Sequence, residues 1–270
     1  MIFSSPAKIN RGFNVIKKRS DGFHDIETVF QFLDWGDEID FNFDVNNSRV
    51  ACPEVEEENN LAFKALHLLK SKFKIKNEVS IKIKKNIPLG SGLGGGSSNA
   101  ATVLLVLNRL WKLNLTNDIL KDLGSSLGSD VPIFIEGEAR EAKGKGEIFS
   151  KSTRKEEVIF LILPNCNIST TKAFQEINPE DFKKSKYEEG FNFFEKWARL
   201  NYKEVDDSFN WLNSIKKGYL SGTGSALYTT FNSFEEARKI MDNAPKINKY
   251  FITRSLNKSP LQKELNKIGV

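Results

Sequence analysis

The sequence predicts an α+β fold with two lobes, formed by residues 1–155 and 156–270. Strand-like and helix-like segments follow one another in mixed order, which is typical of α+β proteins. A glycine-rich stretch, Pro88–Ala101, lies between an alternating strand-like run and a long apolar helix. Composition changes after an apolar run at 158–163, beyond which the chain becomes helical and rich in aromatic residues. A chain of 270 residues can bury the core of one large domain or of two modest ones.

The first lobe is expected to open with a β-hairpin, because the extended segment 4–16 is followed by a polar turn that contains Asp21-Gly22. Apolar residues at helical spacing predict an amphipathic helix at 60–73, and the run that follows the glycine-rich stretch predicts a buried helix. Thr116 is a candidate N-cap for a further helix that ends near Gly124 or Gly128. The remaining strands of this lobe are expected at 23–39 (a buried strand, or a strand that leads into a bend), 39–45, 79–84 and 131–135.

The second lobe is expected to begin with a core strand at 158–163, because this short apolar run ends at a proline. A second glycine-rich element occupies 220–231. Ser233 and Glu236 have the spacing of a capping box and predict the start of another helix. A last strand is expected at 250–253.

Composition limits the class of protein. Hydrophobic residues make up 39% of the chain and charged residues 28%, no stretch approaches the length of a membrane span, and no signal peptide is evident, so we expect a soluble, cytoplasmic protein without a membrane partner. The two cysteines, Cys52 and Cys166, are far apart, which argues against a zinc site or a disulfide framework.

The formal net charge of +5 raises the question of a nucleic-acid partner. Lysine and arginine cluster only weakly, and acidic runs such as Glu56–Glu58 interrupt them. We therefore expect solvated charged faces and no nucleic-acid partner, with a general bias toward anionic small molecules.

The stretch Pro88–Ala101, PLGSGLGGGSSNAA, predicts a phosphate-binding loop. Glycine allows positive φ and a close approach of ligand to backbone N–H groups, and the following helix presents unpaired N–H groups and the positive end of its dipole. A flexible linker is the alternative. The Walker pattern is absent, because no lysine follows the glycines, and a dinucleotide fold requires a strand where this chain is still helical.

Three separated motifs resemble the signature of the GHMP kinases, the superfamily of galactokinase, homoserine kinase, mevalonate kinase and phosphomevalonate kinase. They are PAKIN at 6–10, the glycine-rich loop, and SGTGSAL at 221–227. Further matches at 19–39, 127–147 and 257–261 extend the resemblance over nearly the full length, to members that act on a cytidyl diphosphate alcohol in the non-mevalonate route to isoprenoid precursors.

The resemblance implies a two-lobed GHMP kinase fold, with an N-terminal ribosomal-protein-like β-α lobe and a C-terminal α/β sandwich lobe. It implies ATP-dependent phosphorylation of the 2-hydroxyl of a small cytidyl diphosphate substrate, by a monomer or weak homodimer. Mg²⁺ should accompany ATP, with Ser98 as a candidate ligand. Asn60 and Lys85 are implied near the adenine, and the triphosphate is expected on Pro88, Gly90, Ser91, Gly92, Leu93, Gly94, Gly95, Gly96, Ser97 and Ser98.

The resemblance implies that Asp130 is the general base and that Lys8 orients it and lowers the proton affinity of the hydroxyl. From the residues alone, Asp130 could equally be a helix-terminal or turn aspartate. The apolar neighbours of Lys8, Ala7 and Ile9, favour burial of this lysine.

The substrate's cytosine requires a stacking aromatic residue. Phe23, His24 and Phe174 match the cytidine-binding positions of the family, which commonly has Tyr where this chain has Phe23, so any hydrogen bond from a phenol is lost. Core packing is the alternative for both phenylalanines. Asn10 and Thr170 are candidate contacts to the substrate's hydroxyls.

Two other functions remain open at the level of the sequence. One is a GHMP kinase that acts on a simpler alcohol, and Phe23, His24 and Phe174 argue against it. The other is a non-catalytic nucleotide- or RNA-binding module, and the presence of both Lys8 and Asp130 argues against it.

Overall fold

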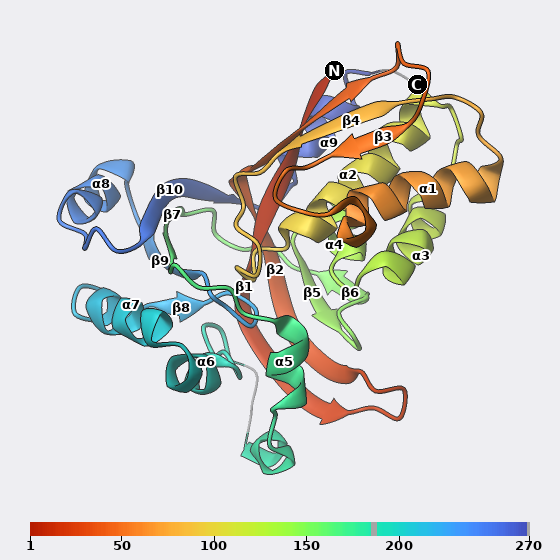
Figure 1. Cartoon of the computed structure of the whole chain (residues 1–270). Coiled ribbons are helices and arrows are strands. Elements are labelled where there is room, and N and C mark those ends of the chain that lie inside the picture. Colours follow the sequence, from red (N-terminus) through yellow and green to blue (C-terminus); the bar gives the residue numbers. More distant parts are fainter. Residues whose placement is uncertain (185–187, 269–270) are drawn as a thin grey trace.

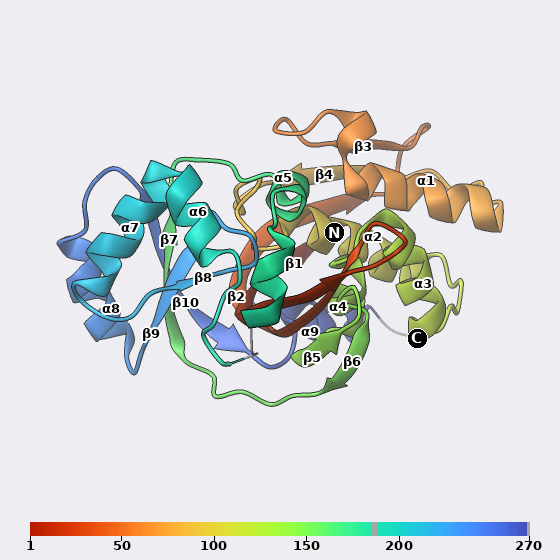
Figure 2. The ribbon, with the colours of Figure 1, turned by 90° about the horizontal axis from the view of Figure 1, so that it is seen from below.

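A long antiparallel hairpin organises the fold. β1 (Ile2–Lys18) pairs with β2 (His24–Asn42) from Ile2 opposite Asp40 to Lys18 opposite His24. The computed structural model describes residues 1–184 and 188–268. The hairpin runs through the middle of the molecule, with the helices of residues 61–136 on one side and those of 195–242 on the other (Figures 1 and 2). The predicted hairpin is confirmed.

The described strands form one ten-stranded sheet with the order β3-β4-β2-β10-β7-β9-β8, in which β1 and β5 also pair with β2, and β6 pairs with β5. The β10 strand joins the two halves, because it pairs with β7 along most of its length and with β2 at its last two residues. Apart from the hairpin, the strands are β3 (Arg49–Ala51), β4 (Ser80–Lys84), β5 (Arg140–Lys143), β6 (Ile148–Lys151), β7 (Val158–Leu163), β8 (Tyr219–Leu220), β9 (Leu227–Phe231) and β10 (Lys249–Leu256).

The predicted helix starts are confirmed at three caps, where the side chains of Asn60, Thr116 and Ser233 accept hydrogen bonds from backbone N–H groups of the first turn. No helix in the described ranges is long and apolar enough to cross a membrane. The helices are α1 (Leu61–Phe73), α2 (Gly95–Leu110), α3 (Asn117–Leu127), α4 (Val131–Glu136), α5 (Thr170–Gln175), α6 (Glu195–Asn201), α7 (Lys203–Asn213), α8 (Phe234–Asp242) and α9 (Pro260–Leu265), with 3₁₀ turns η1 (Glu57–Asn59) and η2 (Pro179–Lys184).

Two sequence-based predictions need correction. The run 131–135 was expected to be a strand, but it forms the short helix α4, which ends where Gly137 takes φ of 70°. All five residues of the run are buried, and a short apolar run that is buried on every side has no periodicity that separates helix from strand. The segments 23–39 and 39–45 were expected as separate strands, but a single strand, β2, spans 24–42.

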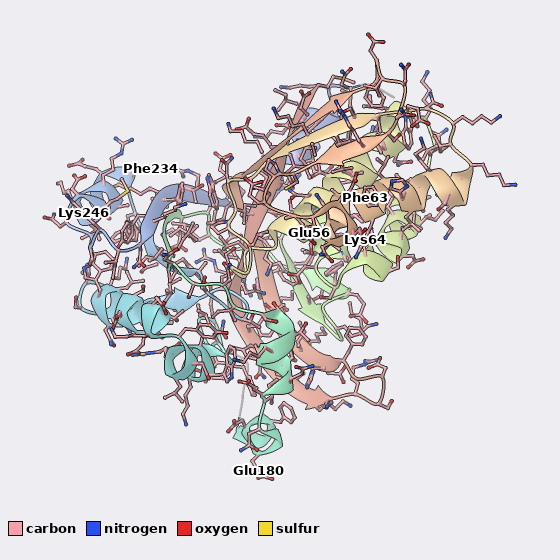
Figure 3. The ribbon with its side chains drawn as sticks, viewed as in Figure 1. Glu56, Phe63, Lys64, Glu180, Phe234 and Lys246 are labelled. Carbon is pink, nitrogen blue, oxygen red and sulfur yellow. The ribbon has the colours of Figure 1, made fainter. Side chains whose placement is uncertain are left out.

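Three clusters of buried side chains form the core. The first packs α1 and α2 against β2 and β4, and the second packs α6 and α7 against β7 and β9. The third contains Ile9 and Leu93 from the first half of the chain together with Leu161 and Tyr228 from the second half. This third cluster fixes the two halves relative to each other. Phe234 on α8 and Glu180 on η2, labelled in Figure 3 at the outer ends of the second half, are not members of this cluster.

The last helix returns to the first half of the molecule. Leu261 and Leu265 of α9 are buried in the first core cluster, and the backbone N–H of Ser4 donates to Glu264 at 2.7 Å. The lobe boundary near residue 155 stays a prediction, but the end of the chain contributes to the core of the lobe in which the chain begins.

We predict that Leu261→Ala lowers the free energy of unfolding by about 2–5 kcal/mol, because it leaves a cavity in the first core cluster. Denaturant unfolding measures this loss. Leu200→Ala is the matched control: Leu200 is 75% exposed, and a change within about 0.5 kcal/mol is expected. Equal stability of the two variants would show that α9 is not part of this core.

Candidate active site

The glycine-rich loop links β4 to α2 and has the backbone conformation that its sequence requires. Gly90, Gly92 and Gly94 all have positive φ, between 63° and 75°. A Cβ at Gly92 would lie only 2.2 Å from the carbonyl oxygen of Ser221. Glycine is therefore required at Gly92 both by the dihedral angle and by the close approach of the second glycine-rich element.

The N-terminus of α2 is open to an anion. Gly94 is the N-cap and has no side chain, and no described side chain caps the helix in its place. The first N–H groups of a helix have no partner within it, and the dipole of this 16-residue helix adds partial positive charge at the same point. Gly95, Gly96 and Ser97 therefore present backbone N–H groups of the kind that can bind an anion, at the place where the sequence predicts a phosphate-binding loop.

Other residues of the loop hold it in place. The Ser91 hydroxyl donates to the Pro88 carbonyl at 2.8 Å, and Leu93 is fully buried in the third core cluster. Ser98 is fully buried, and its hydroxyl accepts a hydrogen bond from that of Ser5 at 2.9 Å. In this conformation the side chains of Ser91, Leu93 and Ser98 stabilise the loop.

The buried carboxylate of Asp37 holds the chain segment that leads into the loop. Asp37 is 1% exposed and accepts hydrogen bonds from the backbone N–H groups of Asn86 and Ile87 and from the Asn99 amide at 2.9 Å. The ammonium of Lys85 forms an ion pair with the same carboxylate and also donates to Asn99. Asp37 thus joins the end of β4 to the first turns of α2.

The side chain of Lys8 is 3% exposed and lies beside the start of α2. Its Nζ donates to Oδ1 of Asn10 at 2.7 Å and to the carbonyl oxygen of Gly92 at 3.1 Å, and lies 3.2 Å from Oδ2 of Asp130. The ammonium group therefore has two hydrogen-bond acceptors and, in Asp130, an ion-pair partner. The structure thus brings Lys8 and Asp130 together, with Asp130 one-third exposed at the N-cap of α4.

The side chain of Asn10 is used within the protein. It is 1% exposed, accepts from Lys8, and donates to the hydroxyl of Thr28 at 2.8 Å. Its backbone N–H donates to the hydroxyl of Ser221, which in turn donates to Gly92 at 3.2 Å. This geometry favours a positioning role for Asn10.

Aromatic side chains gather at the turn end of the hairpin. The ring of Phe174 on α5 lies 5.0 Å from that of His24, and Nζ of Lys145 lies 4.8 Å from the ring centre of Phe23, which is 53% exposed. Burial, with a smaller contribution from the nearby charge of Lys18, lowers the pKa of His24 below its ordinary value, so the neutral imidazole is favoured.

One cavity of about 420 Å³ connects the ammonium–carboxylate pair with the aromatic residues. Three lysines and one aspartate line it, so its charge suits an anionic ligand with an apolar part. Its lining includes Lys8, Gly92, Ser129 and Asp130, then Thr170, Thr171, Gly222 and Thr223, and then Phe13, Lys18, Phe23, His24, Lys145 and Phe174.

Seven predicted residues line this one cavity, of which Phe23 is 53% exposed: Lys8, Phe23, His24, Gly92, Asp130, Thr170 and Phe174. Two others have evident structural roles, since Asn60 caps α1 and Lys85 pairs with Asp37. Sequence reasoning did not assign Lys18, Lys145, Ser221 or Thr223. The SGTG motif could have pointed to Ser221 and Thr223. Lys18 and Lys145 are isolated lysines, and no sequence pattern marks them as site residues.

We predict that Gly92→Ala lowers the free energy of unfolding by more than about 1 kcal/mol and disorders the loop, because φ is 75° and the new Cβ would meet the Ser221 carbonyl. Thermal unfolding of the ligand-free protein measures this. Gly96→Ala is the control for folding only, since the atom nearest to its Cβ would be Cδ1 of Leu61 at 3.8 Å. Equal loss of stability in both variants would contradict the close approach at Gly92.

Family models match both halves of the chain. The GHMP kinases N terminal domain matches residues 60–138, and the GHMP kinases C terminal domain matches residues 170–249. Among solved structures, a 4-(cytidine 5'-diphospho)-2C-methyl-D-erythritol kinase superposes with a TM-score of 0.82 at 26% identity, covering 94% of this chain and 99% of that one. A mevalonate kinase with a TM-score of 0.70 and 15% identity, over 96% of this chain and all of its own, shares the fold. The predicted α+β GHMP kinase fold is confirmed.

Curated relatives resemble the chain over its whole length. The 4-diphosphocytidyl-2-C-methyl-D-erythritol kinase of Marinobacter nauticus is 37% identical, over 98% of this chain and 97% of its own. That of Actinobacillus pleuropneumoniae is 39% identical, over 98% of this chain and 96% of its own. Identity at this level over nearly the whole chain shows that the chain is a kinase and belongs to the 4-diphosphocytidyl-2-C-methyl-D-erythritol kinase family of the GHMP kinases.

Proposed function

We propose that this kinase transfers the γ-phosphate of ATP to the 2-hydroxyl of 4-diphosphocytidyl-2-C-methyl-D-erythritol. The observation that carries the proposal is the position of the Lys8–Asp130 pair, which lies between the open start of α2 and a cavity that ends in aromatic side chains. A phosphate donor on one side and a nucleotide-bearing acceptor on the other are what such an arrangement accommodates.

The donor phosphates bind at the start of α2 in this proposal. The backbone N–H groups of Gly95, Gly96 and Ser97 face the triphosphate, and the helix dipole favours its negative charge. The side chain of Lys8 passes Gly94 so closely that a Cβ there would lie 3.1 Å from Cε of the lysine. The ammonium thus lies where it neutralises charge that develops on the transferred group.

Asp130 acts as the general base. The acceptor oxygen attacks the γ-phosphorus, its proton passes to the Asp130 carboxylate, and the bond from the γ-phosphorus to the bridging oxygen breaks to release ADP. The ion pair with Lys8 orients the carboxylate, because the ammonium is itself fixed by Asn10 and Gly92. Asp130 is one-third exposed on the cavity side, so the carboxylate remains within reach of a bound hydroxyl.

The cytosine of the acceptor stacks in the aromatic end of the cavity, between Phe23 and the His24–Phe174 pair. A neutral imidazole has both a donor and an acceptor nitrogen, which suits the polar edge of a base. Lys18 and Lys145 line the same region and supply positive charge for the diphosphate. Thr170 lies between the two ends of the cavity as a candidate polar contact.

Mg²⁺ bound with ATP would supply further positive charge for the triphosphate, and Ser98 is the candidate side chain that would hold it. Among the described residues no three histidine, cysteine, aspartate or glutamate side chains gather as a ligand set, which fits an ion held mainly by phosphate and water oxygens. For Ser98 to be a ligand, its hydrogen bond with Ser5 must be exchanged for the metal.

Asp130→Asn is expected to lower kcat by about 10²–10⁴-fold, because the amide cannot accept the proton of the acceptor hydroxyl. Coupled release of ADP with the cytidyl substrate, ATP and Mg²⁺ measures this, and thermal unfolding verifies the fold. Asp122→Asn, an exposed substitution on the preceding helix, is the control with unchanged kcat. Normal turnover by Asp130→Asn would remove Asp130 from the mechanism.

The choice of substrate is tested by comparing ADP release with the cytidyl compound, mevalonate, homoserine and galactose. We expect kcat/KM to be highest for the cytidyl compound, because the simpler alcohols leave the aromatic end of the cavity empty.

Phe174→Ala should narrow the preference for the cytidyl compound over the simpler alcohols by raising KM for the cytidyl compound. Equal or better turnover of a simple alcohol would favour another GHMP kinase activity, and salt-dependent RNA binding without ADP release would favour a non-catalytic module.

A further inference from the structure

Thr28 on β2 is a buried polar residue close to the Lys8–Asp130 pair. Its side chain does not line the cavity. It is 2% exposed, and its hydroxyl donates to the carbonyl oxygen of Gly12 at 2.6 Å. The same oxygen accepts a hydrogen bond from Nδ2 of Asn10 at 2.8 Å. Thr28 is therefore connected to Lys8 through a single side chain, that of Asn10.

The donor and the acceptor in each of these hydrogen bonds follow from the two end groups of the series, the Gly12 carbonyl and the Lys8 ammonium. A backbone carbonyl only accepts, so the proton of the Thr28 hydroxyl points to Gly12. The oxygen of Thr28 then faces Asn10 as an acceptor, which selects the NH₂ group of the amide on that side. The amide oxygen must therefore face Lys8, whose ammonium only donates. The Thr28 hydroxyl at one end and the Lys8 ammonium at the other therefore require the same orientation of the Asn10 amide and together hold it.

We propose that Thr28 is a positioning residue for phosphoryl transfer, which acts by holding the Asn10 amide with its oxygen toward Lys8. The inference rests on the proposed function of Lys8 and Asp130. With the amide so turned, the ammonium donates to Asn10 and Gly92 and stays within ion-pair distance of Asp130, at 3.2 Å. If the amide were reversed, its NH₂ group would face the ammonium, and Lys8 would be displaced from the carboxylate.

Replacement of Thr28 by valine removes the hydroxyl and keeps the shape of the side chain. The NH₂ group of Asn10 then lacks its buried acceptor, so the amide is held only at its Lys8 end and its position is less firmly fixed. A small displacement of a catalytic group is enough to slow chemistry strongly, whereas the sites that bind ATP and cytosine are untouched. Thr28→Ser restores the hydroxyl and with it the chain of hydrogen bonds.

The test compares steady-state kinetics of the wild type, Thr28→Val, Thr28→Ser and Thr229→Val. Thr28→Val is expected to lower kcat about 10- to 100-fold, with KM for ATP within about twofold of wild type. Thr28→Ser should retain kcat within about threefold. Thr229 is the matched control, because its buried hydroxyl donates to the Lys217 carbonyl at 2.8 Å on the other half of the molecule. Thr229→Val should keep the wild-type kcat.

A second measurement does not depend on activity. In ¹⁵N-labelled, ligand-free protein, the Asn10 side-chain amide signals should shift or broaden in Thr28→Val and remain in place in Thr28→Ser and Thr229→Val. If wild type lacks activity on the cytidyl substrate, the proposed function fails, while the amide signals still test the hydrogen-bond chain. If Thr28→Val does not fold, Thr28→Cys is compared with Thr28→Ser, because a thiol is a weak donor and acceptor. Unchanged kcat together with unchanged amide signals in the hydroxyl-free variant overturns the proposal.

Discussion

The buried ammonium group of Lys8 is the constraint on which the rest of the site depends. A charged group that is 3% exposed is costly unless every proton has an acceptor. The two acceptors and the ion-pair partner come from three elements: β1 supplies Asn10, the glycine-rich loop supplies Gly92, and the N-cap of α4 supplies Asp130. To satisfy one lysine, the strand, the loop and the helix must therefore lie in a single arrangement, which also places the Lys8–Asp130 pair beside the start of α2.

The second half of the chain completes this arrangement at the Gly92 carbonyl. That oxygen accepts from both Lys8 and the hydroxyl of Ser221, and the close approach of Ser221 is possible because residue 92 has no Cβ. The backbone N–H groups of Ser225 and Ala226 donate to Gly90 and Ser91 in the same way. The SGTG element thus packs against the glycine-rich loop and helps to fix its backbone, although the two segments are far apart in sequence.

Much of the fold and the position of the glycine-rich loop could be predicted from sequence, because the patterns that indicate them lie within short segments of the chain. Alternation found β4, the helical spacing of apolar residues found α1, capping residues found the starts of α3 and α8, and glycine clustering found the loop. What failed or was missed depends on tertiary contacts. The helix α4 is buried on every side and shows no period, Lys85 is drawn to the buried Asp37, and Lys145 approaches Phe23 only because two hairpins meet. A single sequence does not carry such pairings.

The specificity of the site is a property of how the two halves fit together. Lys8, His24 and Asp130 come from the first half, whereas Thr170, Phe174 and Thr223 come from the second, and all line one cavity. The two halves are joined by the short β10–β2 pairing and by the third core cluster, in which Ile9 packs with Leu161 and Tyr228. Ile9 lies between Lys8 and Asn10 on β1, on the opposite face of the strand. The packing that fixes the distance from the reacting groups to the aromatic end is therefore built on the same strand residues that hold the ammonium, so binding and chemistry share one structural support.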